Sequence, residues 1–453
     1  MAQKKRKKKK GSFSLFLIAL AITLTAGCTI LAVCWALWGM DQKDNGTGSA
    51  SVQESQAESA DQAELQDSDD LTGAGGTQEG QDGSAGEDVS DEITNGEGMV
   101  SDNALTEPAG RYDELLADTA YCAANKIYAK ETVSPDEVTL VFGGDILFDD
   151  RYAIMAQMNA RGKGIEGSVS EEMLEVMRNA DICMLNNEFP YTDRGEPTPG
   201  KKFTFRAKPE YASYLLDMGV DIVSLANNHA YDYGEISLTD SIDTLDALEI
   251  PFVGAGRNIE EAVKPVTFVA NDMRIAILSA TQIERYPDPN TPSATAEKPG
   301  VFRCLDISRL VEEIKKAKEE NDFVIVYVHW GSESTDQPDW AQLEQAPQIA
   351  EAGADLVIGD HPHVLQGIVY HGATPVFYSL GNYLFNSKSQ DTCLVEVKLD
   401  ENGLKSLQFI PGRQQSCSVS MHHDEEKERV LSYIRALSPG VTITEEGFVN
   451  KAE

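Results

Sequence analysis

The chain has 453 residues and a formal net charge of −36, with 74 acidic side chains against 38 lysines and arginines. No basic patch occurs beyond the first ten residues, which argues against a nucleic-acid-binding protein. The seven cysteines stand singly, without a Cys-x-x-Cys pair. This spacing argues against both a cysteine zinc site and a disulfide framework.

The N-terminal 40 residues predict a membrane anchor. Residues 1–12 form a basic tip, and residues 13–40 carry no charged side chain, which is ample for the ~20 residues that a transmembrane helix needs. A basic segment before an apolar span favours a cytoplasmic N-terminus, so we expect a single-pass cell-membrane protein with an extracellular C-terminal domain. Two alternatives remain open: a cleaved signal peptide, although its apolar core is usually only about 7–15 residues long, and lipoprotein processing at Cys28.

Residues 41–110 predict a disordered acidic linker. They contain eighteen acidic residues and one lysine, Lys43, among many Gly, Ser and Gln residues. Such a segment buries too little apolar surface to offset the entropy of ordering it, and its like charges extend it. We interpret it as a solubilising tether between membrane and folded domain; recruitment of cations is the alternative.

The remaining chain alternates strand-like and helical patterns, which predicts an α/β domain over residues 136–415. Residues 111–135 are predicted as a lead-in helix and residues 416–453 as a loosely attached appendage. A hairpin is expected at Asn271-Asp272. The predicted strands are 138–142, 181–185, 221–226, 266–269, 274–280, 323–328, 355–358, 375–380, 393–399 and 406–410, and the predicted helices are 170–179, 209–218, 238–248, 307–320 and 340–352.

Short polar clusters stand where five of the apolar strands end. Open α/β sheets bind ligands beyond the carboxyl ends of their strands, so we expect one polar pocket at one edge of a sheet. Imidazole, carboxylate and amide oxygen together suit zinc, manganese or iron better than calcium. A metal-dependent site is therefore the first hypothesis. The clusters are Gly143-Gly144-Asp145, Asn186-Asn187-Glu188, Asn227-Asn228-His229, His329-Trp330-Gly331 and Asp360-His361-Pro362-His363.

Four of the seven histidines belong to these clusters. A single histidine is more often a structural or surface residue, but four of them just past apolar strands favour a shared site. His361 and His363 can converge from one turn, because Pro362 between them limits the conformations to be frozen out. The other three, His371, His422 and His423, are predicted to be surface residues.

Together these motifs resemble the CapA family, which is named for the synthesis of poly-γ-glutamate capsule. The family is similar to the calcineurin-like metallophosphoesterases, and the resemblance therefore implies an αββα sandwich of two β-sheets flanked by helices. It covers about residues 138–385. The segments that carry it are 144–145, 187–188, 202–207, 226–234, 329–333, 361–366 and 379–382.

The resemblance implies a role for each residue of the predicted site. His229 would be the catalytic residue beside the scissile group. Leu147 stands where the metallophosphoesterases have a histidine, so the first of two metal positions lacks one ligand. Lys202 and Arg206 could hold an anionic substrate, and ordinary surface charge is the alternative. The implied metal ligands are Asp145, Glu188, Asn228, His329, His361 and His363.

Two functions remain open from the sequence. The resemblance favours a membrane-anchored, extracytoplasmic protein acting in synthesis or export of an anionic capsule polymer such as poly-γ-glutamate. Its expected partners are that polymer and the membrane subunits of capsule-polymer synthesis. The alternative is a metal-dependent hydrolase of phosphoesters or of the polymer's amide bonds, with one or two divalent ions. Leu147 favours a polymer-binding subunit or a one-metal enzyme.

Overall fold

The computed structural model describes residues 110–283 and 290–453. The predicted basic tip, the apolar span 13–40 and the acidic linker up to residue 109 lie outside the described residues. Within the described ranges, no helix combines the length and the apolar character that crossing a membrane requires.

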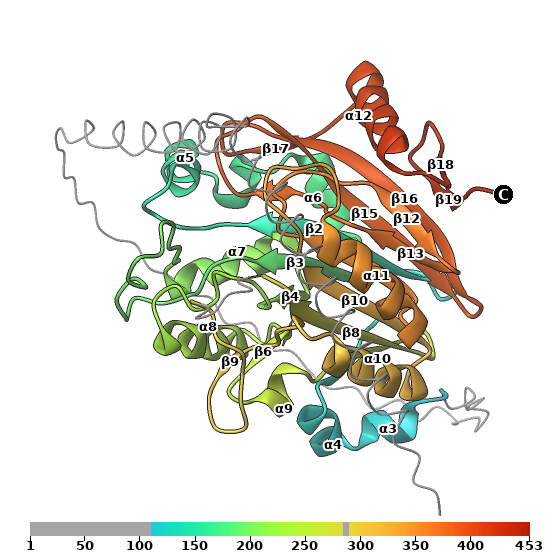
Figure 1. Cartoon of the computed structure of the whole chain (residues 1–453), viewed down its shortest axis with the longest axis horizontal. Coiled ribbons are helices and arrows are strands. Elements are labelled where there is room, and N and C mark those ends of the chain that lie inside the picture. The colour runs from blue at the N-terminus through green and yellow to red at the C-terminus, as the bar shows by residue number, and fades with distance from the viewer. Residues whose placement is uncertain (1–109, 284–289) are drawn as a thin grey trace, which may run out of the picture. The chain divides into compact units, whose positions relative to one another are not determined.

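Two β-sheets form the centre of the fold (Figure 1). The first sheet runs in the order β1 (Ile127–Ala129), β7 (Val266–Ala270), β8 (Met273–Thr281), β10 (Phe323–His329), β11 (Leu356–Asp360), β13 (Thr374–Phe377) and β12 (Ile368–His371). The second sheet runs in the order β17 (Val419–Met421), β16 (Gly403–Gln414), β15 (Gln390–Asp400), β2 (Val138–Ile146), β3 (Ile182–Asn187), β4 (Ile222–Ser224) and β5 (Phe252–Val253), with β14 (Asn382–Leu384) paired to the end of β2. Two small pairs join β6 (Ala255–Gly256) to β9 (Gly300–Val301) and β18 (Val441–Ile443) to β19 (Val449–Lys451).

The two sheets pack face to face. Successive residues of a strand point to opposite faces of its sheet, so Leu140 and Phe142 of β2 share one buried cluster with Ile325 and Tyr327 of β10. Val141, between them in sequence, instead belongs to a cluster on the outer face of the second sheet. This alternation places one buried cluster between the sheets and another between the second sheet and its helices.

Helices cover both outer faces, as Figure 1 shows for α7 and α8 on one side and α10 and α11 on the other. The helices packed on the second sheet are α5 (Ala153–Arg161), α6 (Glu171–Arg178), α7 (Ser213–Met218) and α8 (Glu235–Ala247), with the 3₁₀ turns η2 (Gly164–Gly167) and η3 (Pro209–Ala212). Those on the first sheet are α9 (Ile259–Ala262), α10 (Ser308–Glu320) and α11 (Trp340–Ala352). The layering is helix, sheet, sheet, helix, and the α/β prediction is confirmed.

The predicted hairpin joins β7 to β8 in antiparallel register. Asn271 and Asp272 adopt φ values of 45° and 54°, the left-handed conformation that a two-residue hairpin turn requires. The hairpin prediction is therefore confirmed.

The lead-in segment differs from the single helix predicted for residues 111–135. It forms α3 (Asp113–Ala117), α4 (Thr119–Ala124) and then β1, which pairs with β7 in the first sheet. The break falls at Asp118, whose carboxylate accepts a hydrogen bond of 2.9 Å from the backbone N–H of Tyr121. An N-cap of this kind starts a new helix, so the apolar residues on either side do not form one continuous face.

The C-terminal segment is an integral part of the core, so the prediction of a loosely attached appendage over residues 416–453 is wrong. Strand β17 extends the second sheet, and α12 (Asp424–Leu437) follows it. Val430, Leu431 and Ile434 of α12 are fully buried in the cluster that also contains the inner faces of both sheets. Their helical spacing places the three side chains on one face.

The strands that end in polar clusters belong to two sheets rather than to one. Strands β2, β3 and β4 lie in the second sheet, whereas β10 and β11 lie in the first. The prediction of a pocket at the edge of a single sheet is therefore corrected. The pocket lies where the carboxyl ends of strands from both sheets meet.

Candidate metal centre

The first polar cluster is positioned by a close approach of two backbones. Asp145 pairs with Asn186 on one side and with Asn382 on the other. At Gly144, a Cβ atom would lie 1.8 Å from the carbonyl oxygen of Gly381. Only glycine allows this contact, so the Gly-Asp pair at the end of β2 is needed to place the Asp145 carboxylate beside β14.

The turn after β11 aims two imidazoles at the same space. His361 and His363 have φ values of 93° and 57°, which are unfavourable for residues with a Cβ atom. Such strain persists only where the surrounding structure enforces it, and it is commonest at functional sites.

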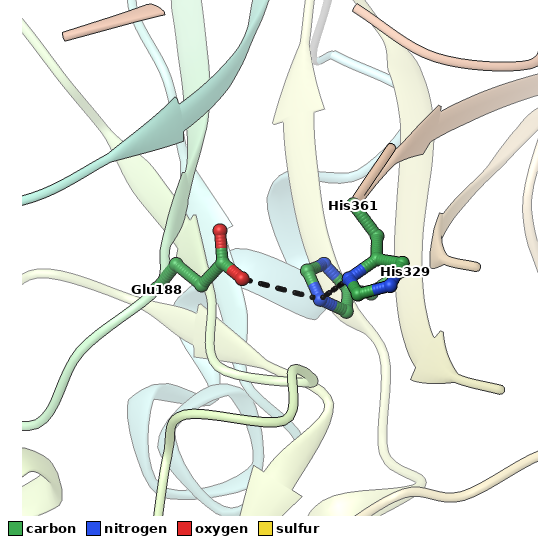
Figure 2. A group of neighbouring side chains, drawn as sticks. All are labelled: Glu188, His329 and His361. Atoms are coloured by element: carbon green, nitrogen blue, oxygen red, sulfur yellow. Dashed lines mark hydrogen bonds and ion pairs between the residues drawn. The ribbon is translucent and has the colours of Figure 1, made fainter. Parts of the chain in front are cut away.

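A first set of donor atoms converges on the Nε2 atom of His329. The distances from this atom are 2.7 Å to Asn228 Oδ1, 3.1 Å to His361 Nδ1 and 3.5 Å to Glu188 Oε1. Figure 2 shows the Glu188 carboxylate pointing toward the two imidazoles from the opposite side. Four potential ligand atoms from four separate segments thus face one another.

A second set lies around the Nδ1 atom of His363. This nitrogen is 3.1 Å from Asp145 Oδ2 and 3.9 Å from Glu188 Oε2. The Glu188 carboxylate therefore directs one oxygen to each set.

The buried carboxylates fit a cation. Asp145 and Glu188 are fully buried, and Asp145 Oδ2 and both carboxylate oxygens of Glu188 accept no hydrogen bond from any described residue. Burial, together with the charges of Asp145 and Asp360, raises the pKa of Glu188 well above its usual value. Asp145 Oδ1 accepts from Asn186 Nδ2, and its Oδ2 lies 3.1 Å from His363 Nδ1. Glu188 has no hydrogen-bond donor at either oxygen among the described residues, and burying such a group costs several kcal/mol, of the order of 2–7 for a polar group and more for a charge. A divalent metal would supply the missing positive charge.

The histidines fit the same ion. Burial lowers the pKa of His329 to about 3, so its imidazole is neutral near pH 7, the form that binds a metal. Its Nδ1 atom lies 3.0 Å from Asp360 Oδ1, and a carboxylate in that place orients the ring so that Nε2 faces the site. The nitrogen and oxygen donors match zinc, manganese or iron.

His229 lies beside this cluster with its outer nitrogen toward it. Its Nδ1 atom is 2.6 Å from Asp232 Oδ2, and its Nε2 atom is 4.0 Å from Glu188 Oε1. Asp232 is also 2.7 Å from the ammonium of Lys201, and the Phe205 ring packs 4.2 Å from the imidazole, centroid to centroid. The fixed ring can hold or release a proton at Nε2.

The structure thus brings together the six predicted metal ligands and the predicted catalytic histidine. It places the predicted anion-binding side chains against aromatic rings: Lys202 Nζ lies 5.0 Å from the Phe203 centroid, and the Arg206 guanidinium 4.6 Å from the Tyr233 centroid. Their role in binding substrate stays a prediction.

Three further residues at the site were not predicted as members of it. Lys201, rather than Lys202, reaches Asp232 and also donates to the carbonyl of Asn228. Nothing in the sequence separates these neighbouring lysines. Asp360 and Asn382 did carry a signal, because each stands in a polar motif directly after an apolar run.

The fold and the site together define the class of protein: an α/β sandwich with buried carboxylates and histidines at one end. The chain belongs to the bacterial capsule synthesis protein PGA_cap family, whose model matches residues 139–387. The resemblance to the CapA family is confirmed.

Two relatives are CapA proteins of Bacillus. The PGA biosynthesis protein CapA of Bacillus subtilis is 30% identical over 289 residues, which cover 62% of this chain and 73% of the relative. The capsule biosynthesis protein CapA of Bacillus anthracis is 29% identical over 305 residues, which cover 64% and 72%. A probable polyglutamine synthesis accessory protein of Mycobacterium tuberculosis is 24% identical over 350 residues, which cover 67% and 92%.

Solved structures are more distant. A Thermus thermophilus protein aligns with a TM-score of 0.32 at 10% identity, covering 62% of this chain and 99% of that one. A 5'-nucleotidase of Candida albicans aligns with a TM-score of 0.33 at 8% identity, covering 62% and 52%. Scores of this size do not establish a common fold.

Proposed function

We propose that this protein is membrane-anchored and extracytoplasmic, and that it acts in the synthesis or export of an anionic capsule polymer such as poly-γ-glutamate. Family membership and the CapA relatives support the polymer. The basic tip and the uncharged span of residues 13–40 support the anchor. The membrane subunits of capsule-polymer synthesis are its proposed partners.

The observation that supports a metal-dependent role for this protein is the set of donor atoms around His329 Nε2. Glu188, Asn228, His329 and His361 would hold a divalent manganese, zinc or iron ion. A bound divalent metal would polarise the bond under attack and stabilise the negative charge that develops there.

His229 and Asp232 would carry out the proton transfer. Asp232 accepts from Nδ1 of His229 and so directs Nε2 toward the site, where it can protonate a leaving group. Burial lowers the pKa of His229, so a proton taken up at Nε2 is readily released. The ammonium of Lys201 balances the buried charge of Asp232.

A second candidate is a metal-dependent hydrolase of phosphoesters or of the polymer's amide bonds, in a metallophosphoesterase-like fold. The fixed His229–Asp232 pair favours this candidate, because a site that only bound polymer would not require an oriented proton donor. Leu147 in place of a histidine favours the binding role.

The test is complementation in the native host. A strain lacking the gene would receive wild type, His361→Ala or, as the matched control, His423→Ala, whose imidazole is 56% exposed. We expect surface polymer with wild type and with the control, and little or none with His361→Ala. Full surface polymer with His361→Ala at equal protein level would refute a role for the cluster.

Activity of the purified proteins separates the two candidates. The full-length chain in detergent would be assayed on polyglutamate and on a generic phosphodiester, with His229→Ala beside wild type. Turnover that is lost in His229→Ala supports the hydrolase. Binding of polymer without turnover supports the subunit that holds it.

A further inference from the structure

The segment Ser379–Asn382 carries part of the family resemblance, and its Gly381 helps to place Asp145, but the side chain of Asn382 has no role assigned so far. Asn382 opens β14 directly beside Asp145, and the Gly381 carbonyl accepts a hydrogen bond of 3.1 Å from the Asp145 N–H. The side chain of Asn382 is 2% exposed. A buried amide next to a buried carboxylate needs an explanation.

The amide of Asn382 has a defined orientation. Its Nδ2 group donates to Gln390 Oε1 over 3.2 Å, and Gln390 Nε2 donates in turn to the carbonyl of His363 over 3.2 Å. The Oδ1 atom of Asn382 therefore faces inward, 2.8 Å from His363 Nδ1. This hydrogen-bond chain ties the amide to the imidazole that it faces.

The inward oxygen joins three other donor atoms. His363 Nδ1 lies within 3.9 Å of Asp145 Oδ2 and of Glu188 Oε2, and Asn382 Oδ1 approaches the same nitrogen from β14. Neither carboxylate oxygen accepts a hydrogen bond from a described residue. Three oxygens and one nitrogen form a hard donor set. This set suits manganese or magnesium better than does the set around His329, which contains two imidazoles.

Leu147 provides no ligand atom to this position. Its side chain is 1% exposed and packs in the apolar cluster under the outer helices, while its N–H donates to the Leu384 carbonyl over 2.9 Å. This hydrogen bond fastens β14 along the end of β2. Strand β14, which pairs with the end of β2 beside Leu147, therefore also positions Asn382 at the site.

We infer that Asn382 is a metal ligand that completes a second metal position with Asp145, Glu188 and His363. Glu188 would offer Oε2 to this position and Oε1 to the position around His329. The inference rests on the proposed metal-dependent function. The family resemblance already implies two metal positions, and the inference adds Asn382 as a ligand at the position where Leu147 leaves one missing.

The test counts bound ions on the full-length chain in detergent. Chelator-stripped protein would be titrated with Mn²⁺ by calorimetry, and spin coupling between the ions would be followed by electron paramagnetic resonance. Wild type should bind two coupled ions. Asn382→Leu and Asn228→Leu should each bind one uncoupled ion, and Asn382→Asp should bind two. Gln390→Leu should weaken the second ion about 10- to 100-fold, as expected for loss of an orienting partner.

The outcomes distinguish failure of the role proposed for Asn382 from failure of the proposed metal-dependent function. Two ions on Asn382→Leu would overturn the role of Asn382. One ion on wild type, lost in Asn228→Leu, would overturn the second position and leave the proposed function standing. No ion on wild type would overturn both. Should circular dichroism show that Asn382→Leu is unfolded, Asn382→Asp decides, because loss of its second ion contradicts the inference and retention supports it.

Discussion

At the scale of single residues, the site is defined by donor atoms that lack ordinary partners. Glu188 has no hydrogen-bond donor among the described residues, although it is fully buried. The residues that do have partners hold the donors in place: Asn186 donates to Asp145 Oδ1 over 2.8 Å, and Asp360 lies 3.0 Å from His329 Nδ1. This division between orienting groups and unsatisfied donors is typical of metal sites.

Replacing Asp360 tests this division. Asp360→Asn keeps the size of the side chain but removes the carboxylate that orients His329. We expect metal affinity to fall about 10- to 100-fold, measured by competition with a fluorescent chelator. Asp336→Asn, a change in the loop after β10, serves as control and should leave the affinity unaltered. Equal affinities for the two variants would count against the orienting role.

The half-buried Lys126 gives a pH-dependent prediction. Burial lowers the pKa of Lys126 from 10.5 to about 8, so the folded state disfavours the charged form. The folded state is therefore penalised at pH 7, and the penalty disappears as the pH rises past 10.5. Lys126→Met should raise the free energy of unfolding by roughly 1–3 kcal/mol at pH 7. Denaturant unfolding should show that gain shrinking toward pH 10.5; a gain independent of pH would contradict this account.

At the scale of elements, the pairing of β14 with β2 is the contact that assembles the site. It depends on the absence of a side chain at Gly144, where β14 runs against the end of β2. Because the strand ends of both sheets meet here, a shift of one strand would displace ligands on both sides.

Gly144→Ala should therefore be severely destabilising. The added methyl would overlap the Gly381 carbonyl, and we expect a loss of about 3 kcal/mol or more, at the upper end of overpacking effects. Gly372→Ala is the control: its φ of 64° strains the backbone, but its Cβ would meet open space, so about 1 kcal/mol is expected. Thermal unfolding measures both. Similar losses would mean that the close approach is unimportant.

Much of the element pattern could be predicted, and the misses have physical causes. Helix α11 occupies residues 340–352 as predicted, because its capping box at Asp339 and the glycine after it mark both ends. The assignment of strands to two sheets could not be predicted, since strands buried on both faces read alike whichever sheet they join. The position of Asn382 beside Asp145 could not be predicted, because the register between β14 and β2 joins residues far apart in sequence.

At the scale of the whole molecule, one of the buried apolar clusters lies between the two sheets, and the C-terminal segment helps to close it. Leu431 of α12 is fully buried in this core, whereas its neighbour Tyr433 is 37% exposed. The segment therefore contributes to stability.

Leu431→Ala should cost about 2–5 kcal/mol of unfolding free energy, the usual range for a buried leucine. Tyr433→Ala is the matched surface change on the same helix and should cost clearly less. Chemical denaturation of the two variants provides the comparison. A cost below that of Tyr433→Ala would show that α12 is dispensable to the core.

The central claim is that strand ends from two sheets build a metal centre around Glu188, His329 and His361. The most direct test is a crystal of the protein grown with Mn²⁺, measured for anomalous scattering. The account predicts a strong anomalous peak bounded by these three side chains and Asn228. Crystals with these side chains ordered but without a peak between them, at millimolar Mn²⁺, would contradict it.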